Sequence, residues 1–206
     1  MMTINLPCSA LIIIDVQNDF CPGGALAVKD GDRVIEPLNR LSGFFAAGGG
    51  RVVATQDWHP DNHASFAVSQ TNGGAEEQLW PVHCVQGSRG ADFHDGLELK
   101  PVNLIIRKGF RPQLDSYSAF FENDRKTSTG LDGFLKNLSI DTLVLGGLAT
   151  DYCVLYSALD AAALGYKTIV AADAIKGVGI PSGSVERAIK LLEEAGVIFA
   201  ASGEIK

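Results

Sequence analysis

The sequence has no cluster of basic residues. Its 24 acidic residues outnumber its 17 basic ones, and the formal net charge is −7. Proteins that bind nucleic acid or anionic membranes carry basic clusters, so we expect neither partner. No apolar run is long enough to span a bilayer. The first residues also lack the basic region and cleavage site of a signal peptide, so we expect a cytoplasmic protein.

Cysteine is scarce, and its four positions are far apart in the sequence. None of them forms a pair at the short spacing of cysteine-pair zinc sites. In the absence of a secretion signal, we expect reduced thiols rather than disulfides. The cysteines are Cys8, Cys21, Cys84 and Cys153.

The length of 206 residues suits a single domain, residues 1–206. Hydrophobic residues make up 46 % of the chain and charged residues 20 %, as in ordinary globular proteins. One segment differs, at about residues 58–96, which is weakly periodic and rich in proline, glycine, histidine and asparagine. So long an irregular segment is usually functional, and we interpret it as an insertion that binds metal and substrate. We expect a monomer or a small homo-oligomer.

Six short apolar runs predict β-strands. They are almost continuously hydrophobic, which is typical of parallel strands covered on both faces. Helical periodicity between several of them predicts an α/β fold, a three-layer αβα sandwich around a mainly parallel six-stranded sheet. The predicted strands are Ala10–Asp15, Arg51–Asp57, Val102–Lys108, Thr142–Gly147, Lys167–Asp173 and Val197–Ala201.

Polar residues stand where these strands end. In open α/β sheets, ligands bind beyond the carboxyl ends of the strands. Any single polar strand end is usually an ordinary solvated turn, but here acids, a lysine and a cysteine occur together. The residues at or just after the strand ends are Asp15, Asp57, Lys108, Cys153 and Asp173.

The four histidines all lie between residues 59 and 94. Asp57 and His59 are two residues apart on an extended segment, so their side chains can face one ion. His83 could complete the set, because one carboxylate and two imidazoles suit zinc, iron(II) or manganese. The alternative is a group of capping and surface histidines.

Cys153 lies in the stretch GGLATDYC, between a strand and a predicted helix. It could belong to a phosphate loop, be a buried structural thiol, or act as a nucleophile. The phosphate loop is disfavoured, because the third glycine and the Lys-Ser/Thr pair are missing. Thr150 and Asp151 are helix-capping residue types, so the helix end and Lys108 would lower the pKa of the thiol. We also expect the two glycines to let the backbone pass close to a ligand.

Five segments in order closely resemble the nicotinamidases, a family within the isochorismatase-like cysteine hydrolases. The resemblance extends from about Ala10 to Asp173. The segments are IIIDVQNDFCPGGAL, ATQDWHPDNHASF, WPVHCVQGSRGADFH, IRKGF and GGLATDYCV.

The resemblance implies an amide C–N hydrolase of NAD salvage that converts nicotinamide, and also pyrazinamide, to the acid and ammonia. Asp15, Lys108 and Cys153 match the catalytic triad, with a thioester formed on the cysteine. The backbone amides of Ala149 and Cys153 match the oxyanion hole, and a cis peptide would join Leu148 to Ala149.

The resemblance also implies one divalent metal ion, Zn²⁺, Fe²⁺ or Mn²⁺, which would hold the pyridine nitrogen directly or through water. Its ligands match Asp57, His59 and His83, and His63 matches a position that is a ligand in some members. Residues that match the walls around the ring are Phe20, Trp80 and Tyr117.

Two other functions are compatible with parts of this pattern. One is a related isochorismatase-type or N-carbamoyl amide hydrolase, which has the triad but generally lacks the Asp-x-His metal set. The other is a non-catalytic binding or redox protein that uses Cys153 as a sensor. That protein would not need Asp15, Lys108 and the histidines at the same strand ends.

Overall fold

Six parallel strands form one sheet in the computed structural model of the protein, which describes residues 1–69 and 79–206. Every neighbouring pair of strands is parallel. The predicted parallel sheet is therefore confirmed. The strands are β1 (Ser9–Ile14), β2 (Arg51–Asp57), β3 (Leu104–Lys108), β4 (Thr142–Leu148), β5 (Lys167–Lys176) and β6 (Ile198–Ala200).

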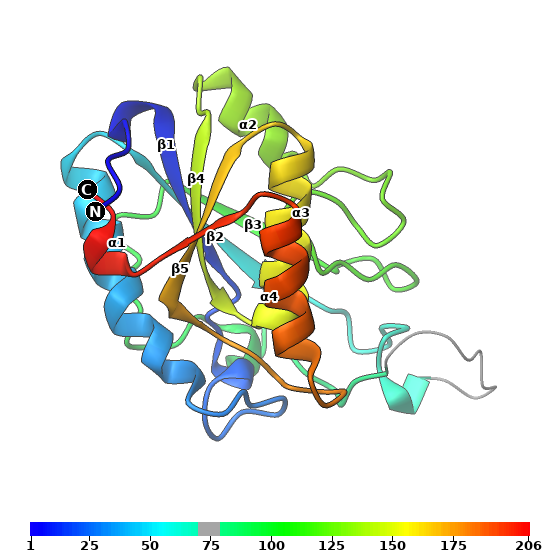
Figure 1. Cartoon of the computed structure of the whole chain (residues 1–206). Coiled ribbons are helices and arrows are strands. Elements are labelled where there is room, and N and C mark those ends of the chain that lie inside the picture. The colour runs from blue at the N-terminus through cyan, green and yellow to red at the C-terminus, as the bar shows by residue number, and fades with distance from the viewer. Residues whose placement is uncertain (70–78) are drawn as a thin grey trace.

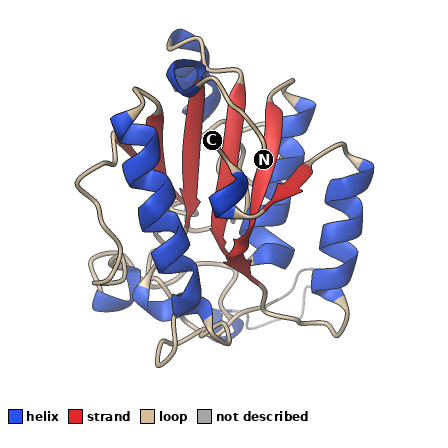
Figure 2. Ribbon diagram, turned by 60° about the vertical axis from the view of Figure 1, so that its left-hand side comes forward, coloured by secondary structure: helices blue, strands red, loops and turns tan. Residues whose placement is uncertain are grey.

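Helices cover both faces of the sheet (Figure 1, Figure 2). Side chains of β1 alternate between two hydrophobic cores, with Leu11 and Ile13 in one and Ile12 and Ile14 in the other. The first core is closed by α1 and the second by the other three α-helices, which gives the predicted αβα layers. The helices are α1 (Ile35–Ala47), α2 (Leu131–Asn137), α3 (Leu155–Ala163) and α4 (Ser184–Glu194).

The order of the strands places a crevice between β1 and β4. The order is β3-β2-β1-β4-β5-β6, so the chain builds outward from β1 to one edge and then from β4 to the other. The connections leave the carboxyl ends of these two central strands in opposite directions, which opens the crevice where ligands bind in such sheets. Asp15 follows β1 and Cys153 follows β4, so both lie at this crevice.

The two glycines at the end of β4 serve packing within the sheet. Gly147 has φ of 127°, and a Cβ there would overlap the carbonyl of Ile14 in β1. A Cβ at Gly146 would lie 2.9 Å from Cδ2 of Leu38 in α1. At these two positions, the absence of a side chain allows β4 to approach β1 and α1.

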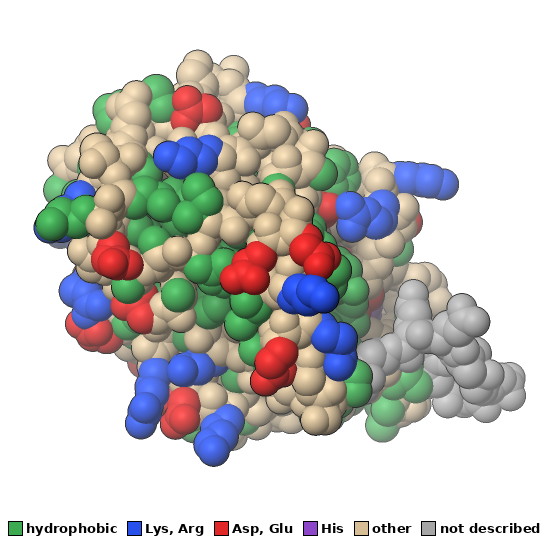
Figure 3. All heavy atoms as spheres, in the orientation of Figure 1, with side chains coloured by type: hydrophobic (Ala, Val, Ile, Leu, Met, Phe, Trp, Pro, Cys, Tyr) green, Lys and Arg blue, Asp and Glu red, His purple; other side chains and the backbone are tan. Residues whose placement is uncertain are grey.

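Between β2 and β3, residues 58–69 and 79–96 contain two short 3-10 helices, Ala67–Ser69 and Arg89–Ala91. Residues 70–78 of the predicted insertion lie outside the described residues. On the face shown in Figure 3, basic and acidic side chains are intermixed rather than gathered into a basic patch. Within the described ranges, no helix has the length and apolar character needed to cross a membrane.

Candidate active site

Three buried side chains from different strand ends meet at the crevice. Asp15 follows β1, Lys108 is the last residue of β3, and Cys153 lies in the first helical turn after β4. Nζ of Lys108 lies 2.8 Å from Oδ2 of Asp15 and 3.4 Å from Sγ of Cys153. All three residues are buried. The structure thus brings together the residues that match the catalytic triad.

Lys108 supplies the cation of this group. Its ammonium also donates to Oδ1 of Asp57 and, at 2.9 Å, to the carbonyl oxygen of Ser116. The ligand atoms of one further group are close enough together to hold a metal ion, those of Asp15, Asp57 and Cys153. The positive charge among them is instead the ammonium of Lys108. Burial alone would lower the pKa of Lys108, but the two carboxylates raise it well above its usual value. Lys108 therefore stays charged.

The surroundings of Cys153 favour the protonated thiol. Burial raises its pKa well above the ordinary value, and the opposing effect of Lys108 is smaller. The expectation of a lowered thiol pKa is therefore wrong, because removal of a thiolate from water outweighs the nearby ammonium. Burial also raises the pKa of Asp15. A carboxylate with a raised pKa beside a thiol is suited to take its proton during a reaction.

The turn that carries Cys153 is wider than an α-helical turn. Residues Thr150–Val154 form a π-helical turn that continues into α3, and the carbonyl of Ala149 accepts two backbone hydrogen bonds from it. The peptide bond between Leu148 and Ala149 is cis, as the resemblance implies. Ala149 and Cys153 both line the pocket, so their amides are candidate donors to an oxyanion.

Asp151 does not cap this helix, although its residue type suggested a cap. No side chain caps the turn. The Asp151 carboxylate instead accepts hydrogen bonds from the amides of Val178 and Gly179, both at 2.9 Å, and from the hydroxyl of Ser184. These bonds hold Val178 in the pocket wall. The expected cap is wrong because a loop distant in sequence supplies the donors.

Asp57, His59 and His83 form a second group beside the triad. Oδ2 of Asp57 lies 3.5 Å from Nε2 of His59 and 3.9 Å from Nε2 of His83. Nδ1 of each histidine faces a backbone carbonyl, that of Gly109 at 2.8 Å for His59 and that of Pro81 at 2.7 Å for His83. These bonds direct both Nε2 atoms toward the carboxylate, as in metal sites.

Asp57 connects the triad to the histidines. Its Oδ1 contacts Lys108 and its Oδ2 faces the imidazoles. Burial alone would raise the pKa of Asp57, but Lys108 and His59 hold it below its ordinary value, so Asp57 is ionised. One carboxylate and two imidazoles with ligand atoms within 4.8 Å of one another suit a divalent metal ion. The chemistry of these residues therefore fits the implied metal.

Both ring nitrogens of His63 have partners within the protein. Nδ1 lies 2.7 Å from the hydroxyl of Ser65, whose amide donates to it at 3.3 Å. Nε2 lies 3.4 Å from the carbonyl of Leu114. The His63 ring packs 4.2 Å from that of His59. This geometry favours a supporting role for His63 over direct ligation.

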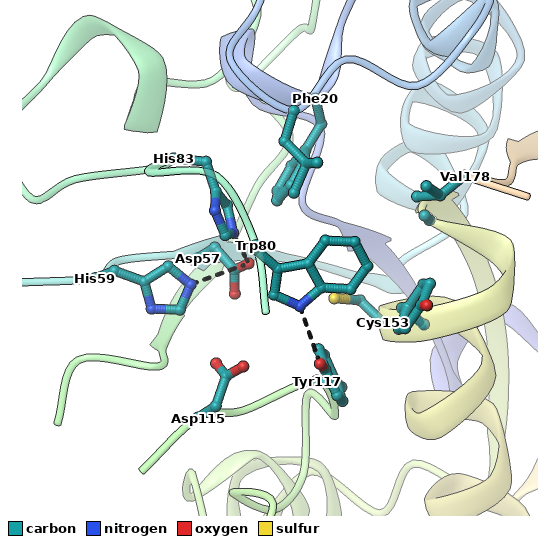
Figure 4. A pocket seen from close by; sticks show the side chains of 12 residues that line it. Phe20, Asp57, His59, Trp80, His83, Asp115, Tyr117, Cys153 and Val178 are labelled. Atoms are coloured by element: carbon teal, nitrogen blue, oxygen red, sulfur yellow. Dashed lines mark hydrogen bonds and ion pairs between the residues drawn. The ribbon is translucent and has the colours of Figure 1, made fainter. Parts of the chain in front are cut away.

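A pocket joins the two groups (Figure 4). Its mostly apolar walls with a few polar side chains suit a small molecule. Nε1 of Trp80 donates to the hydroxyl of Tyr117 at 3.1 Å, and Phe20 packs 5.5 Å from the His83 ring. All three predicted wall residues line the pocket, and Asp15, His63 and Lys108 do not.

Four lining residues were not predicted. Tyr152 directly precedes Cys153 in the first helical turn, so its place beside the candidate nucleophile could have been used to predict it as a pocket residue. The other three lie on irregular loops that no sequence pattern connects to the site. They are Leu26, Asp115 and Val178.

The isochorismatase domain family matches residues 9–202, so the chain belongs to this family. It is 45 % identical over 199 residues to the nicotinamidase of Escherichia coli K12, covering 93 % of each chain. The structure of PnC1 from L. infantum in complex with nicotinate matches with a TM-score of 0.89 and 37 % identity, covering 100 % of this chain and 98 % of that one. The pyrazinamidase of Pyrococcus horikoshii in complex with zinc matches with a TM-score of 0.82 and 35 % identity, covering 95 % and 99 %.

Proposed function

We propose that this chain is a nicotinamidase that hydrolyses nicotinamide to nicotinate and ammonia. The observation that carries the proposal is the contact of Lys108 with Asp15 and Cys153 beside a pocket that is also lined by Asp57, His59 and His83. The identity to the E. coli nicotinamidase over most of both chains supports the same substrate. We propose that the reaction serves NAD salvage in the cytoplasm, on small molecules alone.

The proposed reaction begins with transfer of the Cys153 proton to Asp15. Sγ then forms a bond to the amide carbon, and the oxygen of the tetrahedral intermediate is stabilised by the amides of Ala149 and Cys153. Asp15 returns the proton to the leaving ammonia as the C–N bond breaks, which leaves a thioester. Asp15 next takes a proton from a water molecule that attacks the thioester. The C–S bond then breaks as Asp15 returns this proton to Sγ of Cys153, and the acid product loses its own proton to solvent and leaves as nicotinate. Lys108 keeps its positive charge throughout and stabilises the carboxylate of Asp15 and the thiolate of Cys153.

Asp57, His59 and His83 would hold one divalent metal ion. When bound, the ion would coordinate the pyridine nitrogen, directly or through water. The zinc complex of the P. horikoshii pyrazinamidase supports Zn²⁺, with Fe²⁺ and Mn²⁺ as alternatives for this donor set. The segment of about residues 58–96 carries His59, His83 and Trp80, which supports its role as the insertion that binds metal and substrate.

Ammonia release from the purified protein tests the proposed function. We expect release from nicotinamide and from pyrazinamide, whose ring differs by one nitrogen, and none from an N-carbamoyl amino acid. Turnover of the carbamoyl compound with none of nicotinamide would favour the related amidohydrolases and refute our assignment.

Removal of the metal should raise KM for nicotinamide more than it lowers kcat, because the ion orients the ring while Cys153 and Asp15 perform the chemistry. The measurement is steady-state kinetics after chelation, with elemental analysis to verify removal. Return of Zn²⁺, Fe²⁺ or Mn²⁺ should restore the original KM. Unchanged kinetics in verified apoprotein would contradict the role of the metal in binding.

Trp80→Ala should raise KM for nicotinamide about 10-fold, since loss of roughly 1.4 kcal/mol of ring contact corresponds to a factor of ten. Trp58→Ala is the matched control, because Trp58 lies outside the pocket and stacks 3.8 Å under the guanidinium of Arg107. An equal KM for the two variants would show that Trp80 does not contact the ring.

A further inference from the structure

Asp115 is a carboxylate in the pocket that has no part in the proposed reaction. It lies on the loop between β3 and α2, beside Ser116, whose carbonyl accepts from Lys108. Figure 4 shows its side chain directed toward the region between His59 and Trp80. Oxygen and nitrogen ligand atoms of Asp115, His59 and His63 lie within 4.8 Å of one another. A second set of potential metal ligands therefore adjoins the first.

The two sets share His59, so Asp115 adjoins the cation position that Asp57, His59 and His83 define. Nδ1 of His59 is engaged by the carbonyl of Gly109 at 2.8 Å, which leaves Nε2 as the ligand atom. One nitrogen lone pair binds one metal ion. Asp115 is therefore placed to act on the same ion as Asp57 and His83.

His63 supports the loop that carries Asp115. The Ser65 amide donates to Nδ1 of His63, so in the neutral ring Nε2 carries the proton and donates to the carbonyl of Leu114. The amide of Ala64 donates to the carbonyl of Pro112 at 2.8 Å. Both bonds attach the histidine segment to the residues just before Asp115.

Charge balance gives Asp115 a physical role. Ionised Asp15 and Asp57 with Lys108 have a net charge of −1, since two negative charges face one positive charge. A divalent ion would change this to +1, and Asp115 would return it to zero. Buried charge is costly unless it is compensated.

We propose that Asp115 is the second carboxylate of the metal site, binding the ion directly or through one water molecule, and that His63 positions Asp115 instead of binding the ion. This inference rests on the proposed metal site. The Asp115 carboxylate would raise the affinity of the site for divalent cations and disfavour the binding of a monovalent ion in their place.

Asp115→Asn tests the proposal, because it keeps the shape of the side chain and removes its charge. Dissociation constants for Zn²⁺ and Mn²⁺ would be measured on apoprotein by competition with a chromophoric chelator. We expect binding about 10–100-fold weaker than in the wild type. Asp95→Asn is the matched control, since Asp95 is 85 % exposed and paired only at the surface with Arg89. Equal affinities in Asp115→Asn and wild type would overturn the proposal.

His63→Ala separates a positioning role from ligation. We expect a smaller loss of metal affinity than in Asp115→Asn, and the visible spectrum of the Co²⁺-loaded protein should change in Asp115→Asn more than in His63→Ala. A larger loss and a larger spectral change in His63→Ala would make His63 the ligand and refute the proposal. Thermal unfolding of the apo forms identifies any variant that fails to fold, and Asp115→Ser would then replace it. These measurements need no substrate, so failure to hydrolyse nicotinamide would leave them interpretable.

Discussion

Cys153→Ala is expected to abolish ammonia release from nicotinamide, with kcat/KM lower by about 10⁴-fold or more. Sγ of Cys153, the proposed nucleophile, lies 3.4 Å from Nζ of the charged Lys108 and in the pocket wall. The variant should still bind metal, because Cys153 is not among the residues proposed as ligands. Steady-state ammonia release and metal titration would measure the two effects separately.

The control for this variant is Cys8→Ala. Cys8 immediately precedes β1, at the end of the strand opposite Asp15, and we expect wild-type turnover. Mass spectrometry of wild-type protein quenched during turnover should detect an acyl group on Cys153. Turnover of nicotinamide by Cys153→Ala at the wild-type rate would refute both the thioester and the role of the triad.

Lys108→Met should lower kcat/KM by about 10³-fold or more and also reduce the free energy of unfolding by about 3–5 kcal/mol. The methionine has nearly the same length but leaves Asp15 and Asp57 facing each other without a cation. Because both carboxylates are buried, this uncompensated charge is costly. Denaturant unfolding and ammonia release would measure the two losses.

Arg107→Met is the matched control for the lysine. Arg107 is the adjacent residue of β3, but its side chain is exposed and stacks on Trp58 outside the pocket. We expect a change in unfolding free energy of less than about 0.5–1 kcal/mol and no change in kcat. If Lys108→Met is as active as Arg107→Met, the lysine does not stabilise the reacting anions.

Local patterns predicted most of the fold. The strand β2 has the predicted bounds, Arg51–Asp57, and the other strands lie close to theirs. This is possible because a parallel strand buried on both faces must be apolar at nearly every position, and that constraint is visible in a short run of residues.

Asp173 shows where such patterns fail. It was predicted to end a strand at the ligand-binding edge, but β5 continues to Lys176 after its register shifts against β4. Asp173 instead accepts hydrogen bonds from the amide and hydroxyl of Ser202, at 2.7 and 2.6 Å. The end of a strand depends on its neighbour, which the residues of that strand do not reveal.

Residue types and their spacing along the chain placed Asp15, Lys108 and Cys153 among the candidates at strand ends and identified the Asp-x-His pair, because strand ends and motifs are local properties. The family resemblance then singled out the triad. Three other features depend on folding. They are the protonation of Cys153, the contact of Asp57 with both Lys108 and the histidines, and the presence of Asp115 in the pocket. Each results from burial and from charges contributed by segments far apart in the chain. A pKa or a charge balance belongs to the assembled site, so only the tertiary structure decides it.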